Sequence, residues 1–146
     1  MKISELLSTD LGSSISVTNE PFTKVGQAEI MLEDGTNMFW LFDDEDHMLS
    51  VAPKEDELVL FHHISEEMEP SEMILFQNKE YEFSYEDAGT IKKVEGDPSV
   101  EEEDHVVFSD YESKDGEIVR IVTNENSGEV MSFVGRTVSE EDVLEI

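Results

Sequence analysis

Apolar and polar residues alternate along most of this chain, with a period of two that is typical of half-buried β-strands. The alternation is clear in Ser14–Val17 and Ala28–Leu32. Further apolar segments of strand length span residues 38–42, 48–51, 58–61, 73–76, 81–85, 106–108, 118–122 and 130–134. About ten short strands separated by turn residues predict an all-β or mainly β fold, an antiparallel barrel or sandwich.

Three segments depart from this pattern. Ile3, Leu6 and Leu7 lie at helical spacing, which predicts a short amphipathic N-terminal helix ending near Gly12. Residues 19–21 (Asn-Glu-Pro) predict a break after the first strand. The tail, 137–146, fits either a helical turn opened by Ser139 or a last edge strand.

Met38–Phe42 is apolar throughout, which predicts a strand covered on both faces. We expect Trp40 to be buried there with Phe42 or Phe39, near the junction of two halves of the chain. The turn that precedes this strand contains Gly35, which can take the positive φ of a tight hairpin.

We distinguish two halves of the chain because the sequence contains an apparent internal repeat. Glu29–Thr36 is echoed by Glu82–Thr90, each an alternating segment that runs into a predicted acidic, glycine-containing turn and a threonine. The sequence therefore predicts two related β-meanders, 28–61 and 81–134, within a single domain, 1–146. The acidic stretch 95–104 is the expected insert, and we predict that it forms a mobile loop.

The composition is that of a folded protein, and the net charge restricts the kinds of partner that the protein can bind. Of 146 residues 38% are hydrophobic, yet 37 acidic and nine basic residues leave a net charge of −28. Such a surface repels nucleic-acid phosphates and anionic lipid headgroups, and it attracts basic protein surfaces, polyamines or divalent cations. Two alternative interpretations of the acidity are a solubilising surface and imitation of DNA. No apolar run approaches the roughly 20 residues of a membrane span and no signal peptide is evident, so we expect a cytoplasmic protein without membrane insertion.

One turn carries candidate metal ligands. Asp43, Asp44, Asp46 and His47 cluster there, but the spacing of an EF-hand loop is missing, and a solvated hairpin turn is the favoured interpretation. His62 and His63 are adjacent, so on a strand their rings point to opposite faces and cannot both bind one ion. There is no cysteine, the strongest ligand of the usual zinc patterns.

The sequence contains no nucleophile elbow, phosphate-binding loop, dinucleotide fingerprint or zinc-protease helix. We therefore predict a non-catalytic acidic interaction or accessory module that needs no cofactor. Two alternatives stay open: a divalent-cation-dependent binder or enzyme using the Asp43–His47 turn, and a DNA-mimic inhibitor.

The partner would dock on the segment Phe61–Leu75, where methionines lie within an acidic frame. The candidate residues are Glu66, Glu67, Met68, Glu69 and Met73. Two alternatives are that these apolar side chains complete the core and that the partner binds the Glu101–Asp104 loop.

Turn and aromatic motifs give the chain a resemblance to a bacterial family of β-rich domains of unknown function. The motifs, between about residues 24 and 138, are Phe39–Asp43 with Met48–Val51, Asn78–Tyr81 entering Phe83–Asp87 and then Glu95-Gly96, and Phe108–Tyr111 leading to Gly128-Glu129 and Gly135. The resemblance implies a β-rich domain without known catalytic residues. It also implies genes encoded near small membrane proteins and phage-shock-type coat proteins, and hence an accessory role in a membrane-associated stress system.

Overall fold

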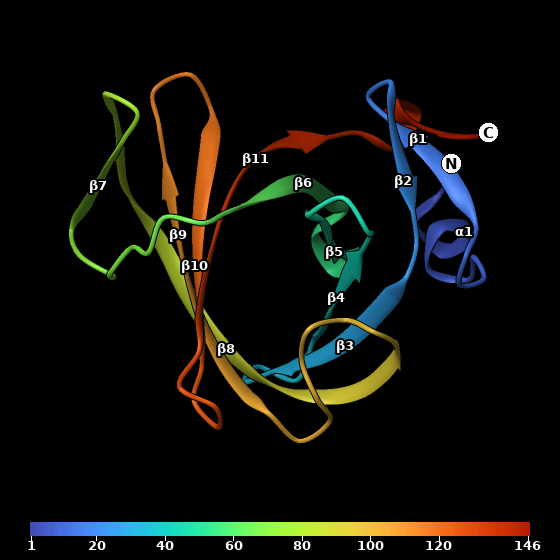
Figure 1. Ribbon diagram of the computed structural model, residues 1–146, viewed down its shortest axis with the longest axis horizontal. Coiled ribbons are helices and arrows are strands. Elements are labelled where there is room, and N and C mark those ends of the chain that lie inside the picture. Colours follow the sequence, from blue (N-terminus) through green and yellow to red (C-terminus); the bar gives the residue numbers. More distant parts are fainter.

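The computed structural model describes residues 1–146 as one short helix, α1 (Ile3–Leu7), and twelve strands that hold 58% of the chain. Eight strands form a closed antiparallel barrel (Figure 1). They are β3 (Gly26–Leu32), β4 (Asn37–Phe42), β5 (His47–Ala52), β6 (Glu57–Ile64), β8 (Lys79–Gly96), β9 (His105–Glu112), β10 (Glu117–Asn124) and β11 (Val130–Val138). The predicted mainly β fold is confirmed, and of the two predicted architectures the barrel is the one formed.

The other four strands lie outside the ring. They are β1 (Ser14–Val17), β2 (Glu20–Thr23), β7 (Met73–Phe76) and β12 (Val143–Glu145). A small sheet in the order β12-β1-β2 flanks the barrel on one side together with α1, and β7 extends the large sheet beyond β8 on the other (Figure 1). Two short 3₁₀ turns, Pro53–Glu55 and Glu140–Asp142, complete the elements.

Two strand pairings close the barrel. β3–β6 and β8–β11 each form a four-stranded meander, and the meanders join where β6 pairs with β11 and where β3 pairs with β8. Each half of the chain thus supplies four of the eight barrel strands. The predicted common origin of residues 28–61 and 81–134 stays a prediction.

The inward faces of the strands fill the barrel with apolar side chains. Trp40 is fully buried among them, and its ring lies edge-on to Phe108 of the second meander at 5.8 Å between centroids. The interior is therefore a packed core built from both halves of the chain. Phe42 shares this core, whereas Phe39 packs against the opposite face of β4.

The outward faces of the barrel are covered in two places. Leu41 and Leu49 pack under α1 and the small sheet. The prediction that β4 is covered on both faces is therefore confirmed. On the other side, Met68 and Ile74 cover Tyr111 and Val119 of β9 and β10. The chain thus buries three separate apolar clusters, one inside the barrel and two outside it.

Two predicted turns are strand instead. Pro21 was expected in a break, but the turn is confined to Thr18 and Asn19, and Pro21 lies within β2, an edge strand that needs no donor on its open side. Residues 86–90 lie inside β8 rather than in a turn. Gly89 permits this, because a Cβ there would lie 2.7 Å from Cγ2 of Ile30 on the neighbouring strand.

The acidic insert, 95–104, is tied to one end of the barrel. Val100 is buried in the barrel core, and the backbone N–H of Ile91 donates to the carbonyl of Asp104 at 2.8 Å. The segment expected to be a mobile loop is therefore anchored by a core side chain and by backbone hydrogen bonds.

The predicted N-terminal helix is present as α1, but it ends at Leu7 rather than near Gly12; at the other chain end, the tail follows the prediction. Ser139 caps the 3₁₀ turn and β12 follows as an edge strand, so both alternatives for the tail occur in succession. Neither α1 nor any other helical segment has the length and apolarity that crossing a membrane requires.

Candidate functional site

A cleft of about 510 Å³ opens at the end of the barrel where β4, β6 and β8 finish. We call it the acidic cleft. Its lining residues are Val25, Phe42, Asp43, Asp44, Asp46, His47, His63, Asp97, Ser99, Glu129, Met131 and Phe133. Five of the twelve carry carboxylates, none is lysine or arginine, and four apolar side chains lie between the acidic ones.

The β4–β5 turn forms one wall of this cleft, and Asp43 holds the turn together. The buried carboxylate of Asp43 accepts hydrogen bonds from the backbone N–H of Glu45 at 3.0 Å and of His47 at 2.8 Å. It also lies 2.6 Å from Nδ1 of His47. Asp43 therefore satisfies the turn's own donors and orients the imidazole beside it.

Asp44 and Asp46 behave differently from Asp43, although the sequence presents them as one cluster. Both are exposed, and Asp46 takes a left-handed backbone conformation with φ of 65° that closes the turn. Of the four predicted metal candidates only His47 belongs to a set of three donors close enough to share an ion, and its companions are Glu20 and His62. The turn by itself does not gather a ligand set.

The histidine group lies outside the barrel wall, where β2 crosses β5 and β6. Nε2 of His47 and Nε2 of His62 each lie 3.4 Å from the same carboxylate oxygen of Glu20. His47 and His62 are cross-strand partners, with ring centroids 4.5 Å apart. Sequence reasoning missed this group because its members are brought together by strand register and by the docking of β2.

The two adjacent histidines do face opposite ways, as expected for a strand. His63 points into the acidic cleft, where its ring lies 5.4 Å from that of Phe133. His62 points outward toward Glu20. One imidazole thus belongs to the cleft and the other to the histidine group.

A buried ion pair, Arg120 with Asp110, lies against Phe61 and Phe108 of the apolar core. Arg120 donates from Nε and Nη2 to the two carboxylate oxygens of Asp110 at 2.7 and 2.9 Å, and from Nη1 to Ser50 at 2.7 Å. Its guanidinium lies 4.8 Å from the ring centroids of Phe61 and Phe108.

The chemistry of this pair is set by its surroundings. Burial alone would lower the pKa of Arg120, but the Asp110 carboxylate, together with Tyr85 and Glu57, outweighs it and the pKa is raised. Burial also raises the pKa of the nearby Tyr85 hydroxyl to about 12, although Arg120 opposes the shift. The Arg120 guanidinium donates to both carboxylate oxygens of Asp110 and to Ser50. The pair is therefore a fixed structural element rather than a site for an external anion.

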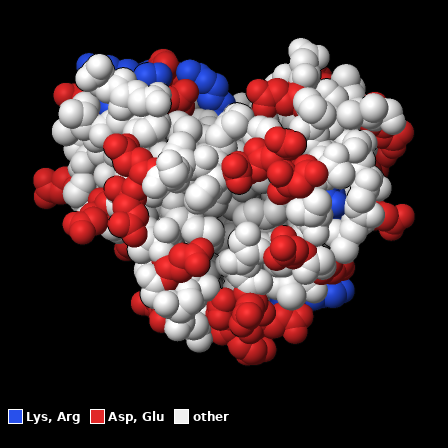
Figure 2. All heavy atoms as spheres, in the orientation of Figure 1, with Lys and Arg blue, Asp and Glu red and all other residues white.

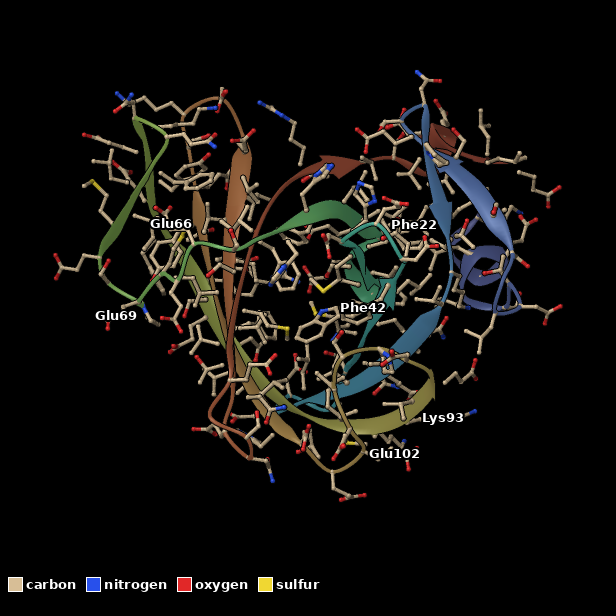
Figure 3. The ribbon with its side chains drawn as sticks, viewed as in Figure 1. Phe22, Phe42, Glu66, Glu69, Lys93 and Glu102 are labelled. Atoms are coloured by element: carbon tan, nitrogen blue, oxygen red, sulfur yellow. The ribbon has the colours of Figure 1, made fainter.

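The predicted docking segment, Phe61–Leu75, is divided by the structure. Met68 and Ile74 are buried in the outer cluster, so for them the alternative that they complete the core holds. Glu66, Glu67 and Glu69 are exposed on the connection between β6 and β7, and Figure 3 shows Glu66 and Glu69 on the other side of the molecule from Phe22. Met73 remains 45% exposed on β7, the edge strand of the large sheet.

Acidic side chains cover much of the face seen in Figure 2, including a group near its centre over the β4–β5 turn. Basic side chains are few there and gather mainly at the upper left edge. Negative charge on this face is therefore dense where the acidic cleft opens.

Comparison with known proteins identifies the family and nothing finer. No curated protein and no solved structure matches this chain. A family described as a domain of unknown function matches residues 11–140, most of the chain and somewhat more than the resemblance seen in its turn and aromatic motifs. The chain belongs to this family, DUF4178.

Proposed function

We propose that this protein is a non-catalytic interaction module that binds a basic segment of a partner protein in the acidic cleft. The observation that carries the proposal is the lining of the cleft, with five carboxylates, no lysine or arginine, and an apolar floor that includes Phe42 and Phe133. A role in a membrane-associated stress system is the setting that the family resemblance suggests.

The chemistry of such a cleft suits lysine and arginine side chains. Their methylene stems can lie against apolar surface while their charged ends meet the carboxylates at the rim. Unbalanced negative charge around a concave surface also speeds the approach of a basic partner and disfavours acidic ones. The same charge argues against DNA as a ligand.

The test uses a fluorescent peptide of alternating lysine and leucine as the probe, with binding followed by anisotropy at 50 mM and 500 mM sodium chloride. The cleft variant combines Asp44→Asn, Asp97→Asn and Glu129→Gln. We expect it to lose at least about tenfold in affinity at low salt, because three unpaired carboxylates are removed from the binding surface.

A matched control separates the cleft from general charge. Glu66→Gln, Glu67→Gln and Glu69→Gln together make the same change in net charge on the β6–β7 connection. We expect this variant to bind within about twofold of the wild type. Equal losses in both variants would contradict a cleft-specific site, and a loss confined to the control would place the partner on the segment 66–69 instead.

A further inference from the structure

We propose that Glu20, His47 and His62 form a binding site for a divalent transition metal ion, with zinc as the best fit. His47 also lines the acidic cleft, but the inference does not rest on the function proposed for that cleft. It begins with three side chains from three strands, whose ligand atoms all lie within 4.8 Å of one another.

The distances suit a tetrahedral ion. Zinc bonds to histidine nitrogen and carboxylate oxygen at about 2.0–2.2 Å, which places neighbouring ligand atoms of a tetrahedron about 3.4 Å apart. Nε2 of His47 and Nε2 of His62 each lie 3.4 Å from Oε2 of Glu20. The ligand atoms of the two histidines lie within 4.8 Å of each other, so a tetrahedral ion among the three side chains would require the imidazoles to adjust toward it.

Asp43 prepares His47 for this role. A carboxylate can only accept, so its contact with Nδ1 at 2.6 Å places a proton on that nitrogen and leaves Nε2 of the neutral ring free to bind an ion. Carboxylates in this position orient metal-binding histidines and raise their basicity. The residue that the sequence suggested as a direct ligand is thus a positioning residue.

The backbone fixes the remaining two ligands. Glu20 and Phe22 lie on the same face of β2 because strand side chains alternate. Phe22 is buried against the barrel (Figure 3), and this aims Glu20 at the wall. His62 is held opposite His47 by the pairing of β5 with β6.

Two of the three ligands are half exposed, which leaves room for further coordination. The side chains of Glu20 and His62 are each 48% exposed, whereas that of His47 is 14% exposed. Three protein ligands with an open fourth position characterise zinc sites that bind a water or an external group. The ion would also link the small sheet to the barrel, so binding should stabilise the fold.

The experiment compares zinc with magnesium on the full chain after chelator treatment. We expect zinc, measured by calorimetry, to bind with one-to-one stoichiometry and to raise the melting temperature above its value in equimolar magnesium, which controls for screening of the acidic surface. Cobalt(II) should show the intense visible absorption of a four-coordinate ion.

Variants locate the site. Glu20→Gln and His62→Gln should each weaken zinc binding by about 100-fold, and Asp43→Asn by about 10- to 100-fold. His63→Gln is the matched control, since it changes the adjacent residue that faces the cleft, and it should bind zinc as the wild type does. His62 is half exposed, so its replacement should leave the fold intact, as circular dichroism can verify.

Zinc stabilisation no greater than that by magnesium would overturn the proposal. So would unchanged zinc affinity in the His62→Gln variant, because the ion would then be held by other surface carboxylates.

Discussion

Two groups of acidic residues at opposite ends of the barrel differ in their partners. Near the β9–β10 turn, Asp115 and Glu117 are paired: both contact Lys79 and Arg136, with Lys79 to Asp115 the closest pair at 3.0 Å. At the other end the acidic cleft has five carboxylates and no lysine or arginine among its lining residues.

The comparison teaches that net charge alone says little about function in this chain. Acidic residues with basic partners stabilise their end of the barrel, and those without partners repel one another. Binding is the function we propose for the acidic cleft, where the charge is unbalanced and the surface is concave. The predictions below test this division between supporting and unpaired acidic residues.

The largest effect is expected inside the barrel. Asp110→Ala should lower the free energy of unfolding by about 3–5 kcal/mol, because it leaves the Arg120 guanidinium buried without a counter-charge. Urea denaturation measures the loss. Replacing both partners, as Asp110→Leu with Arg120→Met, should recover most of it. A loss below about 1 kcal/mol in the single variant would show that the pair does not support the fold.

A smaller effect on the free energy of unfolding should distinguish Asp43 from its neighbour Asp44 in the cleft. Asp43→Ala should cost about 1–3 kcal/mol, since a buried carboxylate that satisfies two backbone N–H groups is removed. Asp44→Ala should change stability by no more than about 0.5 kcal/mol, because Asp44 is exposed. Equal losses in urea denaturation would remove the distinction between a turn-forming and an unpaired carboxylate.

Added salt should stabilise the acidic cleft by screening repulsion and weaken the ion pairs at the opposite end of the barrel. We expect the melting temperature of the wild type to rise with sodium chloride over the sub-molar range, because screening relieves repulsion among unpaired carboxylates. The triple cleft variant should melt about 2–4 °C higher than the wild type at low salt and respond less to added salt. Lys79→Gln, which breaks a paired contact, should melt lower. A steady fall of the wild-type melting temperature from low to moderate salt would mean that ion pairs dominate.

The smallest effect concerns Asp115 at the paired end. Hydrogen bonds from Ser113 and Lys79, with further help from Arg136, hold the pKa of Asp115 well below its ordinary value. Its stabilising contribution is therefore complete above the ordinary aspartate pKa and declines as the pH falls below that value. Asp115→Asn should slightly lower the melting temperature at pH 7, and the difference should narrow in acid. A difference that stays constant between pH 7 and pH 3 would exclude an ionic origin.

The fold could be predicted from the sequence because its strands follow a local rule. Alternating segments and apolar segments of strand length identified every barrel strand, and the apolar Met38–Phe42 identified the strand covered on both faces. Strand β8 was underestimated, since Gly89 looks like a turn residue. Only its close approach to Ile30 shows why glycine is needed within the strand.

The candidate site was less predictable because its members are distant in sequence. The turn containing Asp43 was noticed, but its role depends on hydrogen bonds that composition does not reveal. Glu20 meets His62 only because β2 docks across the barrel, and the register that pairs His47 with His62 is a tertiary property. Likewise, the lack of lysine and arginine in the lining of the cleft becomes evident only when the strand ends are brought together in the barrel.

Barrel closure has a consequence for the speed of folding. The pairing of β3 with β8 joins residues 26–32 to 89–96, and the pairing of β6 with β11 joins 58–64 to 132–138. Each meander can form from neighbouring hairpins, but both closing pairs require distant parts of the chain to meet before their contacts compensate for the lost entropy. The chain should therefore fold in milliseconds to seconds rather than microseconds, with closure of the ring as the slow step.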